Sequence, residues 1–169
     1  MRLEIVLWPD PVLLGGARPV KKVDPELRDV VGEMRRVMFE LRGVGLAAPQ
    51  VGVDRRLMLV CPSGVPGDDI VVINPTILSA EGEDLAEEGC LSFPGIYGRV
   101  SRPQSIHVRY RDLDWKERDL TLDGFVARIY QHESDHLDGK VFIDMMEPED
   151  RRAIAADLEE LKKRFDARV

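Results

Sequence analysis

Residues 130–139 of the 169-residue chain read YQHESDHLDG and contain the pattern His-Glu-x-x-His. On an α-helix, residues four apart lie on one face, so His132 and His136 can both reach one metal ion. Glu133 lies one position round the helix from His132, where it can take a proton from water without itself binding the metal. The stretch therefore predicts a helix that carries a metal site. The alternative is a core helix that happens to hold two of the chain's three histidines.

Length and composition restrict what kind of protein carries this helix. A chain of 169 residues, 44% hydrophobic and 33% charged, is typical of one globular domain, here residues 1–169. No apolar run approaches the length of a membrane span, and the N-terminus lacks the features of a signal peptide, so we expect a cytoplasmic protein with no membrane partner. The formal net charge of -7 argues against broad affinity for nucleic acid, so no DNA partner is expected.

Apolar periodicity predicts helices on either side of the chain's middle part. Asp24 and Pro25 have the residue types of an N-cap and a first helical position, and Gly43 is placed to end that helix. Residues 124–129 extend the histidine helix backwards, and Gly139 ends it. Pro148 opens a last helix with an apolar stripe on a charged surface. That stripe consists of Ile154, Leu158, Leu161 and Phe165.

Alternating and short apolar runs predict the strands. They lie at residues 3–7, 56–60, 70–73, 105–111 and 117–122, with one more within residues 76–86 and a short strand or extended run at 141–143. Asn74 and Pro75 are expected to break the strand at 70–73. In the strand at 105–111, His107 shares a face with two arginines, which indicates a half-exposed histidine rather than a ligand.

A catalytic metal usually takes three protein ligands, so a third one has to be found. The metzincin pattern requires a histidine three residues after Gly139, but Phe142 stands there. Thermolysin-like enzymes take the third ligand from a glutamate on a following helix. The candidates here are Glu149, Glu159 and Glu160, but they lie on a charged helix face that is expected to be exposed. Cys90 follows a glycine and precedes a short apolar segment, so its thiolate is a candidate ligand. A second buried, inert thiol is the alternative reading of Cys90.

Three segments together resemble the peptide deformylase family. They are residues 43–50 (GVGLAAPQ), 88–92 (EGCLS) and 131–137 (QHESDHL), in the order and spacing of the family. Flanking segments extend the resemblance over nearly the whole chain, whose length is similar to the shorter bacterial type with a C-terminal helix. The resemblance implies an α+β fold in which antiparallel or mixed sheets wrap a central helix carrying the two histidines, with an N-terminal and a C-terminal helix besides.

The resemblance also implies the chemistry. It implies a metal held by Cys90, His132 and His136, with Fe²⁺ as the usual ion and Zn²⁺, Ni²⁺ or Co²⁺ able to replace it. Metal-bound water, with Glu133 as general base, would attack the N-formyl carbon of formylmethionine on nascent polypeptides and release formate. The side-chain amide of Gln50 and the backbone N–H of Leu91 would stabilise the oxyanion.

Helix spacing and the resemblance also predict which residues bind the substrate. Phe125 and Ile129 share a helix face with His132, so they are predicted to line an apolar pocket for the methionine side chain, with Val44 and Gly45 contributing. Residues 64–69 and 95–99 are expected to shape the substrate groove. A monomer is expected, and contact with the ribosome near the exit tunnel is a hypothesis.

Two other functions are compatible with the His-Glu-x-x-His helix. One is a metallopeptidase of another class, which needs a third ligand downstream of the helix. The other is a non-catalytic site in which Cys90, His132 and His136 hold a structural metal, closed by a fourth ligand from Cys61 or His107. Under that second hypothesis Glu133 would have no function.

Overall fold

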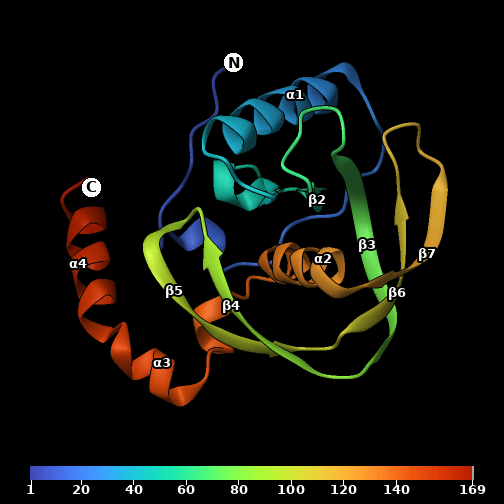
Figure 1. Cartoon of the computed structure of the whole chain (residues 1–169). Helices are drawn as coiled ribbons and strands as arrows, with labels where there is room; N and C mark the ends of the chain where they lie inside the picture. The colour runs from blue at the N-terminus through green and yellow to red at the C-terminus, as the bar shows by residue number, and fades with distance from the viewer. Residues whose placement is uncertain (169) are drawn as a thin grey trace.

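The computed structural model, which describes residues 1–168, places helix α2 (Gly124–Leu137) at the centre, with strands curving around it (Figure 1). One sheet has the strand order β1-β2-β3-β6-β7, and β4 and β5 form a second, two-stranded sheet. The strands of the first sheet are β1 (Gly45–Ala47), β2 (Leu57–Val60), β3 (Ile70–Glu81), β6 (Ser105–Arg111) and β7 (Glu117–Asp123). The second sheet pairs β4 (Asp84–Cys90) with β5 (Phe93–Arg102). The expected α+β class is confirmed, and every strand pairing within residues 1–168 is antiparallel.

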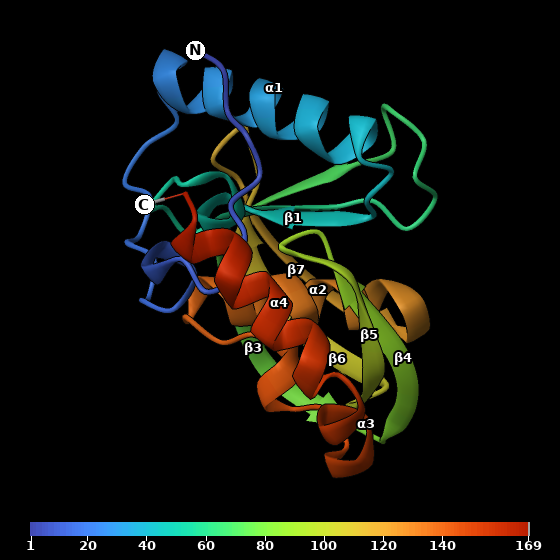
Figure 2. The ribbon, with the colours of Figure 1, turned by 90° about the vertical axis from the view of Figure 1, so that its left-hand side faces the viewer.

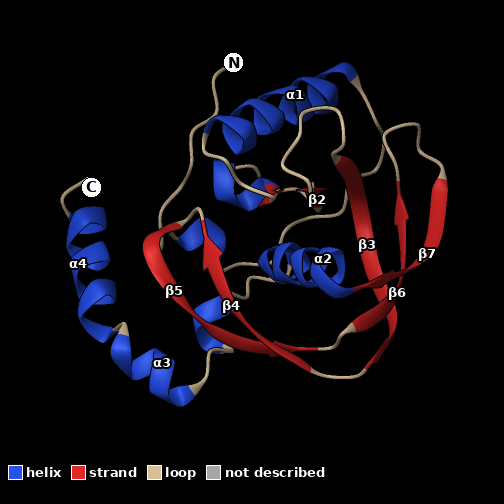
Figure 3. Ribbon diagram, viewed as in Figure 1, coloured by secondary structure: helices blue, strands red, loops and turns tan. Residues whose placement is uncertain are grey.

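The other helices lie at the periphery of the molecule, outside the sheets (Figure 3). Helix α1 (Pro25–Glu40) begins as predicted, since the Asp24 side chain accepts a hydrogen bond from the backbone N–H of Leu27. Two further helices, α3 (Pro148–Ala153) and α4 (Ala155–Asp166), lie at the opposite end of the chain. Three 3₁₀ turns connect the larger elements: η1 (Pro11–Leu13), η2 (Ala48–Val51) and η3 (Phe142–Asp144). No helix within residues 1–168 combines the length and the apolar character needed to cross a membrane.

Helix α2 is buried over most of its length, which is what places polar side chains in the interior. Ile129, Tyr130 and Leu137 pack with side chains of β2, β3 and β6 in one apolar cluster. His132 and Glu133 lie in the same buried helix and are only 8% and 5% exposed. Buried polar groups require partners or a function, because desolvation without compensation costs free energy. The central helix is thus the place in the fold where a reactive site is expected.

The end of α2 is fixed by Gly139, as predicted. Its φ of 74° lies in the left-handed region, which glycine adopts without strain. A Cβ atom at this position would also lie 2.8 Å from the carbonyl oxygen of Leu14. Gly139 therefore lets the chain leave the helix and pass directly against the N-terminal segment.

The strand predictions are most accurate where apolar and polar residues alternate cleanly. The strands at 105–111 and 117–122 are confirmed as β6 and β7, and the two strands at 56–60 and 70–73 as β2 and the start of β3. The predicted break at Asn74 and Pro75 is wrong: β3 continues through them to Glu81. The two residues form a bulge, where a proline removes no ladder hydrogen bond. The Asn74 side chain stabilises this bulge by bonding both the N–H and the C=O of Val20.

Three other local predictions need correction. Residues 3–7 form no strand; single backbone bonds attach this segment to the body instead, such as that from Val6 N–H to the carbonyl of Gln50. The predicted extended run at 141–143 is largely the 3₁₀ turn η3. The last helix is divided at Ile154, but the predicted stripe still docks, with Ile154, Leu158 and Leu161 buried and Phe165 half-buried. Apolar content alone does not distinguish a short strand from a short turn.

Candidate active site

Three side chains that can donate to a metal converge at the middle of α2. A sulfur from Cys90 and one imidazole nitrogen each from His132 and His136 all lie within 4.8 Å of one another. The Cys90 Sγ atom is 3.4 Å from Nε2 of His136. The two histidine rings are 5.2 Å apart between centroids, one helical turn from each other as the spacing predicts. Thiolate and imidazole donors suit divalent transition metals, so this donor set fits such an ion.

Cys90 reaches this position because of a hairpin that the sequence did not reveal. It is the last residue of β4, and β5 starts only three positions later, so residues 90–93 form a tight turn over α2. The β4–β5 pairing shifts register between Gly89 and Cys90. That irregularity re-aims the cysteine side chain, as bulges commonly do. The third candidate ligand thus comes from a different sheet than the one that packs on the helix.

The charges around the two histidines favour positive charge in the cluster. Burial opposes protonation of His132, but Glu133, Cys90 and Glu88 outweigh it and raise the pKa of His132 well above its ordinary value. Burial lowers the pKa of His136 well below its ordinary value, and the nearby His132 lowers it further. His136 therefore stays a neutral imidazole with a lone pair to donate. The acidic groups that favour a positive charge on His132 would favour a bound cation in the same place, and such a cation would displace the proton from His132.

Glu133 is a buried carboxyl group beside this cluster. Its Oε1 atom has no hydrogen-bond partner among residues 1–168. Burial is the main reason that the pKa of Glu133 rises to about 7, with Glu88 adding to it. A carboxyl group with a pKa near neutrality can both accept a proton and return it. The geometry therefore leaves Glu133 available to act on a molecule in the cavity.

Gln50 and Leu91 reach the cluster from η2 and from the β4–β5 turn. Gln50 is 1% exposed, and its Oε1 atom accepts a hydrogen bond from the N–H of Ala47 at 2.9 Å. Its Nε2 group is thereby directed to Cys90 Sγ at 3.4 Å and to Ser92 Oγ at 3.2 Å. The backbone bond at Oε1 fixes the amide orientation, so the N–H₂ end faces the cluster. Leu91 lies in the adjoining turn, half-buried.

One open cavity of about 660 Å³ is lined by Cys90, His132, Glu133, Gln50 and Leu91, whereas His136 does not line it. The four residues predicted to bind substrate line it too: Val44, Gly45, Phe125 and Ile129. Ile129 is 5% exposed and lies deep in the cavity, whereas Phe125 is 57% exposed. Gly95 and Tyr97 contribute from the 95–99 segment, as expected. Residues 64–69 do not line this cavity; Asp69 pairs with Arg35 of α1 at 2.7 Å instead.

A buried carboxylate that sequence analysis did not single out holds the site together. Glu88 accepts from His132 Nδ1 at 2.8 Å, and it pairs with the guanidinium groups of Arg102 and Arg128. Burial opposes its ionisation, but the hydrogen bonds from His132 and Arg102 outweigh this and lower the pKa of Glu88 to about 2. The contact to Nδ1 fixes the ring so that Nε2 faces the cluster. Arg128 lies four residues before His132, on the same face of α2. In the sequence, this spacing was the one indication that both side chains could share a buried acidic partner.

We expect Glu88→Gln to weaken both the metal site and the fold. The change keeps the size of the side chain but leaves Arg102 and Arg128 buried without their shared counter-charge, at a cost of about 3 kcal/mol. Loss of the carboxylate partner of a ligating histidine should lower metal affinity about 10- to 100-fold. Urea unfolding and metal titration measure the two effects. Glu87→Gln, on the exposed side of the same strand, is the control and should change neither; equal effects from both variants would contradict this role of Glu88.

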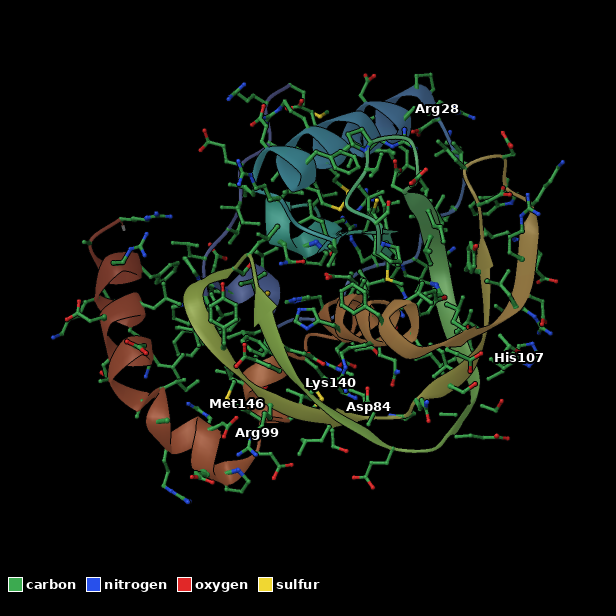
Figure 4. The ribbon with its side chains drawn as sticks, viewed as in Figure 1. Arg28, Asp84, Arg99, His107, Lys140 and Met146 are labelled. Atoms are coloured by element: carbon green, nitrogen blue, oxygen red, sulfur yellow. The ribbon has the colours of Figure 1, made fainter. Side chains whose placement is uncertain are left out.

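The other candidate ligands lie elsewhere. His107 points outward from β6, away from α2, and pairs with Asp119 of β7 (Figure 4). Glu149 is exposed and lies near Arg99, and Glu159 and Glu160 are exposed on α4. Cys61 is buried in a separate apolar cluster against α1. Among residues 1–168, only Cys90 completes a three-donor cluster with the two histidines.

Comparisons with known proteins identify relatives of this chain. The family model described as polypeptide deformylase matches residues 2–152. The chain is 42% identical to a peptide deformylase of Rhodopirellula baltica over 170 residues, covering 99% of this chain and 85% of the relative. It is 46% identical to one of Chlorobium phaeobacteroides over 165 residues, covering 95% and 88%.

Solved structures extend the match to three dimensions. A peptide deformylase from Plasmodium falciparum superposes with a TM-score of 0.95 at 36% identity, covering 97% of this chain and 98% of that one. A plant peptide deformylase gives a TM-score of 0.95 at 40% identity, covering 99% and 92%. Agreement in sequence, fold and nearly full length shows that this chain is an enzyme of the peptide deformylase family.

Proposed function

We propose that this protein removes the N-formyl group from the formylmethionine of nascent polypeptides and releases formate. The observation that carries the proposal is the cluster of Cys90, His132 and His136 beside the buried carboxyl group of Glu133, at a cavity that Cys90, His132 and Glu133 line. Membership of the family supplies the reaction class. The cavity supplies a place where a short chain end can meet a general base and hydrogen-bond donors together.

Cys90, His132 and His136 would hold one divalent metal, for which we propose Fe²⁺, with Zn²⁺, Ni²⁺ or Co²⁺ able to replace it. When bound, such an ion acts as a Lewis acid and makes water more acidic. The protein's own contribution is to keep the donors in place. Glu88 orients His132, and the β4–β5 turn carries Cys90 onto the helix.

Proton transfer is assigned to Glu133. Its carboxylate takes a proton from the water that adds to the formyl carbon, and then gives this proton to the leaving amine as the C–N bond breaks. Formate and a free amino terminus result. Burial of the carboxylate against Gly45 and Ile129 keeps bulk water from competing for the proton.

Charge that develops on the formyl oxygen needs donors fixed in advance. We assign this role to the Nε2 group of Gln50 and the backbone N–H of Leu91. The hydrogen bond from Ala47 N–H to Gln50 Oε1 holds the amide in the orientation that this task requires. The methionine side chain is assigned to the apolar part of the cavity, with Ile129, Val44 and Gly45 inside and Phe125 at the opening.

The two alternative functions find less support in the geometry. A metallopeptidase of another class needs a ligand downstream of α2, and the glutamates considered for it lie on exposed helix faces. A closed structural site needs a fourth donor, and neither Cys61 nor His107 lies in the cluster. A monomeric state, contact with the ribosome and a cytoplasmic location stay predictions from the sequence.

The test is formate release from formyl-Met-Ala-Ser, measured anaerobically on protein loaded with Fe²⁺. We expect rapid release of one formate per peptide, and no cleavage of the Met-Ala bond. Folded, metal-loaded protein that releases no formate would overturn the proposal. Cleavage of internal peptide bonds instead would favour the metallopeptidase.

Gly45 gives a test that alters no polar group. A Cβ atom at this position would lie 2.5 Å from Oε2 of Glu133 and 2.8 Å from Cγ2 of Ile129. Because a shift of about 1 Å in a catalytic group can cost about 100-fold in rate, we expect Gly45→Ala to lower kcat at least tenfold. Gly32→Ala, at an exposed position of α1 with no atom within 4 Å of the added Cβ, is the control. Unchanged kcat in Gly45→Ala would show that Glu133 is not held against this glycine.

A further inference from the structure

Three arginines from distant parts of the chain line the outer part of the active-site cavity. Arg42 follows the end of α1, and Arg164 and Arg168 belong to the last turns of the chain. All three are exposed. None takes part in the chemistry proposed above, so their position on the cavity wall calls for a separate explanation.

The placement of Arg164 and Arg168 follows from how α4 docks. Ile154, Leu158 and Leu161 are buried in an apolar cluster with Leu7, Trp8 and Phe93. Residues three positions apart share one helix face, so Arg164 continues the face that Leu161 buries, and Arg168 follows in the turn just after α4. Figure 2 shows α4 running along the body towards the N-terminal segment, where Ile5 and Leu7 line the same cavity. The docked stripe thus directs the two arginines to the cavity opening.

Within residues 1–168, no ion pair neutralises the positive charges of these three arginines. Arg128 also lines the cavity, but Glu88 pairs with it. By contrast, no carboxylate among residues 1–168 lies within ion-pair distance of Arg42, Arg164 or Arg168. Glu87 is the exposed acidic residue on the β4 side of the opening. One side of the opening is therefore basic in a protein whose formal net charge is -7.

We propose that Arg42, Arg164 and Arg168 select formylated peptides that carry a carboxylate downstream of the methionine. This inference rests on the proposed function, because a chain end held at Glu133 must leave the cavity through this opening. Extended peptide advances about 3.3 Å per residue, so residues after the methionine pass the arginines in turn. Guanidinium groups pair well with carboxylates. A peptide is favoured over RNA as the ligand because the arginines lie on the wall of the catalytic cavity.

The experiment compares kcat/KM for formyl-Met peptides of six residues with amidated ends. Aspartate or lysine is placed at each position from the second to the sixth, with alanine elsewhere. At the best position we expect wild type to favour aspartate over lysine roughly fivefold, the size typical of exposed ion pairs. This ratio should fall towards one in R164E/R168E and, independently, in R42E. It should also fall as salt rises. Peptides with free carboxyl ends show whether the chain terminus can replace the side chain.

R152E is the matched control, since Arg152 is an exposed arginine of α3 that does not line the cavity. It should keep the wild-type ratio. Equal rates for aspartate and lysine peptides at every position would overturn the inference, as would an equal loss of preference in R152E. Inhibition by oligouridylate that R164E/R168E abolishes, without any peptide preference, would assign the arginines to RNA instead. If the protein releases formate from none of these peptides, the proposed function itself is refuted.

Discussion

Glu133→Gln should lower kcat for formate release from formyl-Met-Ala-Ser about 10³-fold, within the range for loss of a general acid-base group. Glutamine has the same size as glutamate but cannot accept the proton from water or return it to the amine. Since Glu133 Oε1 has no partner among residues 1–168, the change breaks no hydrogen bond and should not unfold the protein. A buried carboxyl group is also replaced by a neutral one, which burial favours.

Stopped-flow or steady-state formate assays measure the loss, with metal content and thermal unfolding determined on the same samples. Glu87→Gln is the control for removing one carboxylate near the cavity. If Glu133→Gln keeps more than a tenth of the wild-type kcat with metal bound, Glu133 is not the general base. Loss of metal together with activity would instead place Glu133 among the groups that hold the ion.

Cys90→Ser should abolish metal binding and, with it, activity. A serine hydroxyl stays protonated near neutral pH, whereas a thiolate donates readily to transition metals. The loss of affinity should exceed the 10- to 100-fold that follows removal of an outer partner such as Glu88. The protein should stay folded, since Cys90 is only partly buried at the end of β4.

Metal content after gel filtration measures this effect, and the thiolate absorption band of the Co²⁺-loaded protein identifies the ligand directly. Cys61→Ala is the matched control, because Cys61 is the other free thiol and lies in a separate cluster against α1. It should keep one metal per chain. Full metal content in Cys90→Ser would remove the third ligand proposed here and reopen the search for a downstream one.

Much of the site was predictable because its strongest signals are local. Residues 132–136 place two imidazoles and a carboxyl group in one helix, and helix geometry alone relates them. The start of α1 at Asp24 and Pro25 is equally local, as is the alternation of β6. In each case the residues that interact lie within one or two turns, or on one strand face. Local order therefore suffices to predict their arrangement.

Predictions failed where a short segment takes its conformation from distant contacts. Asn74 and Pro75 resemble a strand break, but the side-chain bonds of Asn74 to Val20, 54 residues away, turn them into a bulge. Residues 141–143 are apolar enough for a strand, yet they bury their side chains as a turn beneath β5. No pattern within either segment contains that information.

Local sequence patterns predict the central helix, its two candidate histidine ligands and Glu133, and the family resemblance predicts the α+β class. How the site is completed follows only from the three-dimensional fold. It brings Cys90 onto α2 from a separate hairpin, makes Glu88 the shared partner of His132, Arg102 and Arg128, and places Arg164 and Arg168 at the cavity opening. Periodicity reports only which face of an element is buried. Which faces meet is fixed by packing and by long-range pairing, whose free energies depend on residues far apart in the chain.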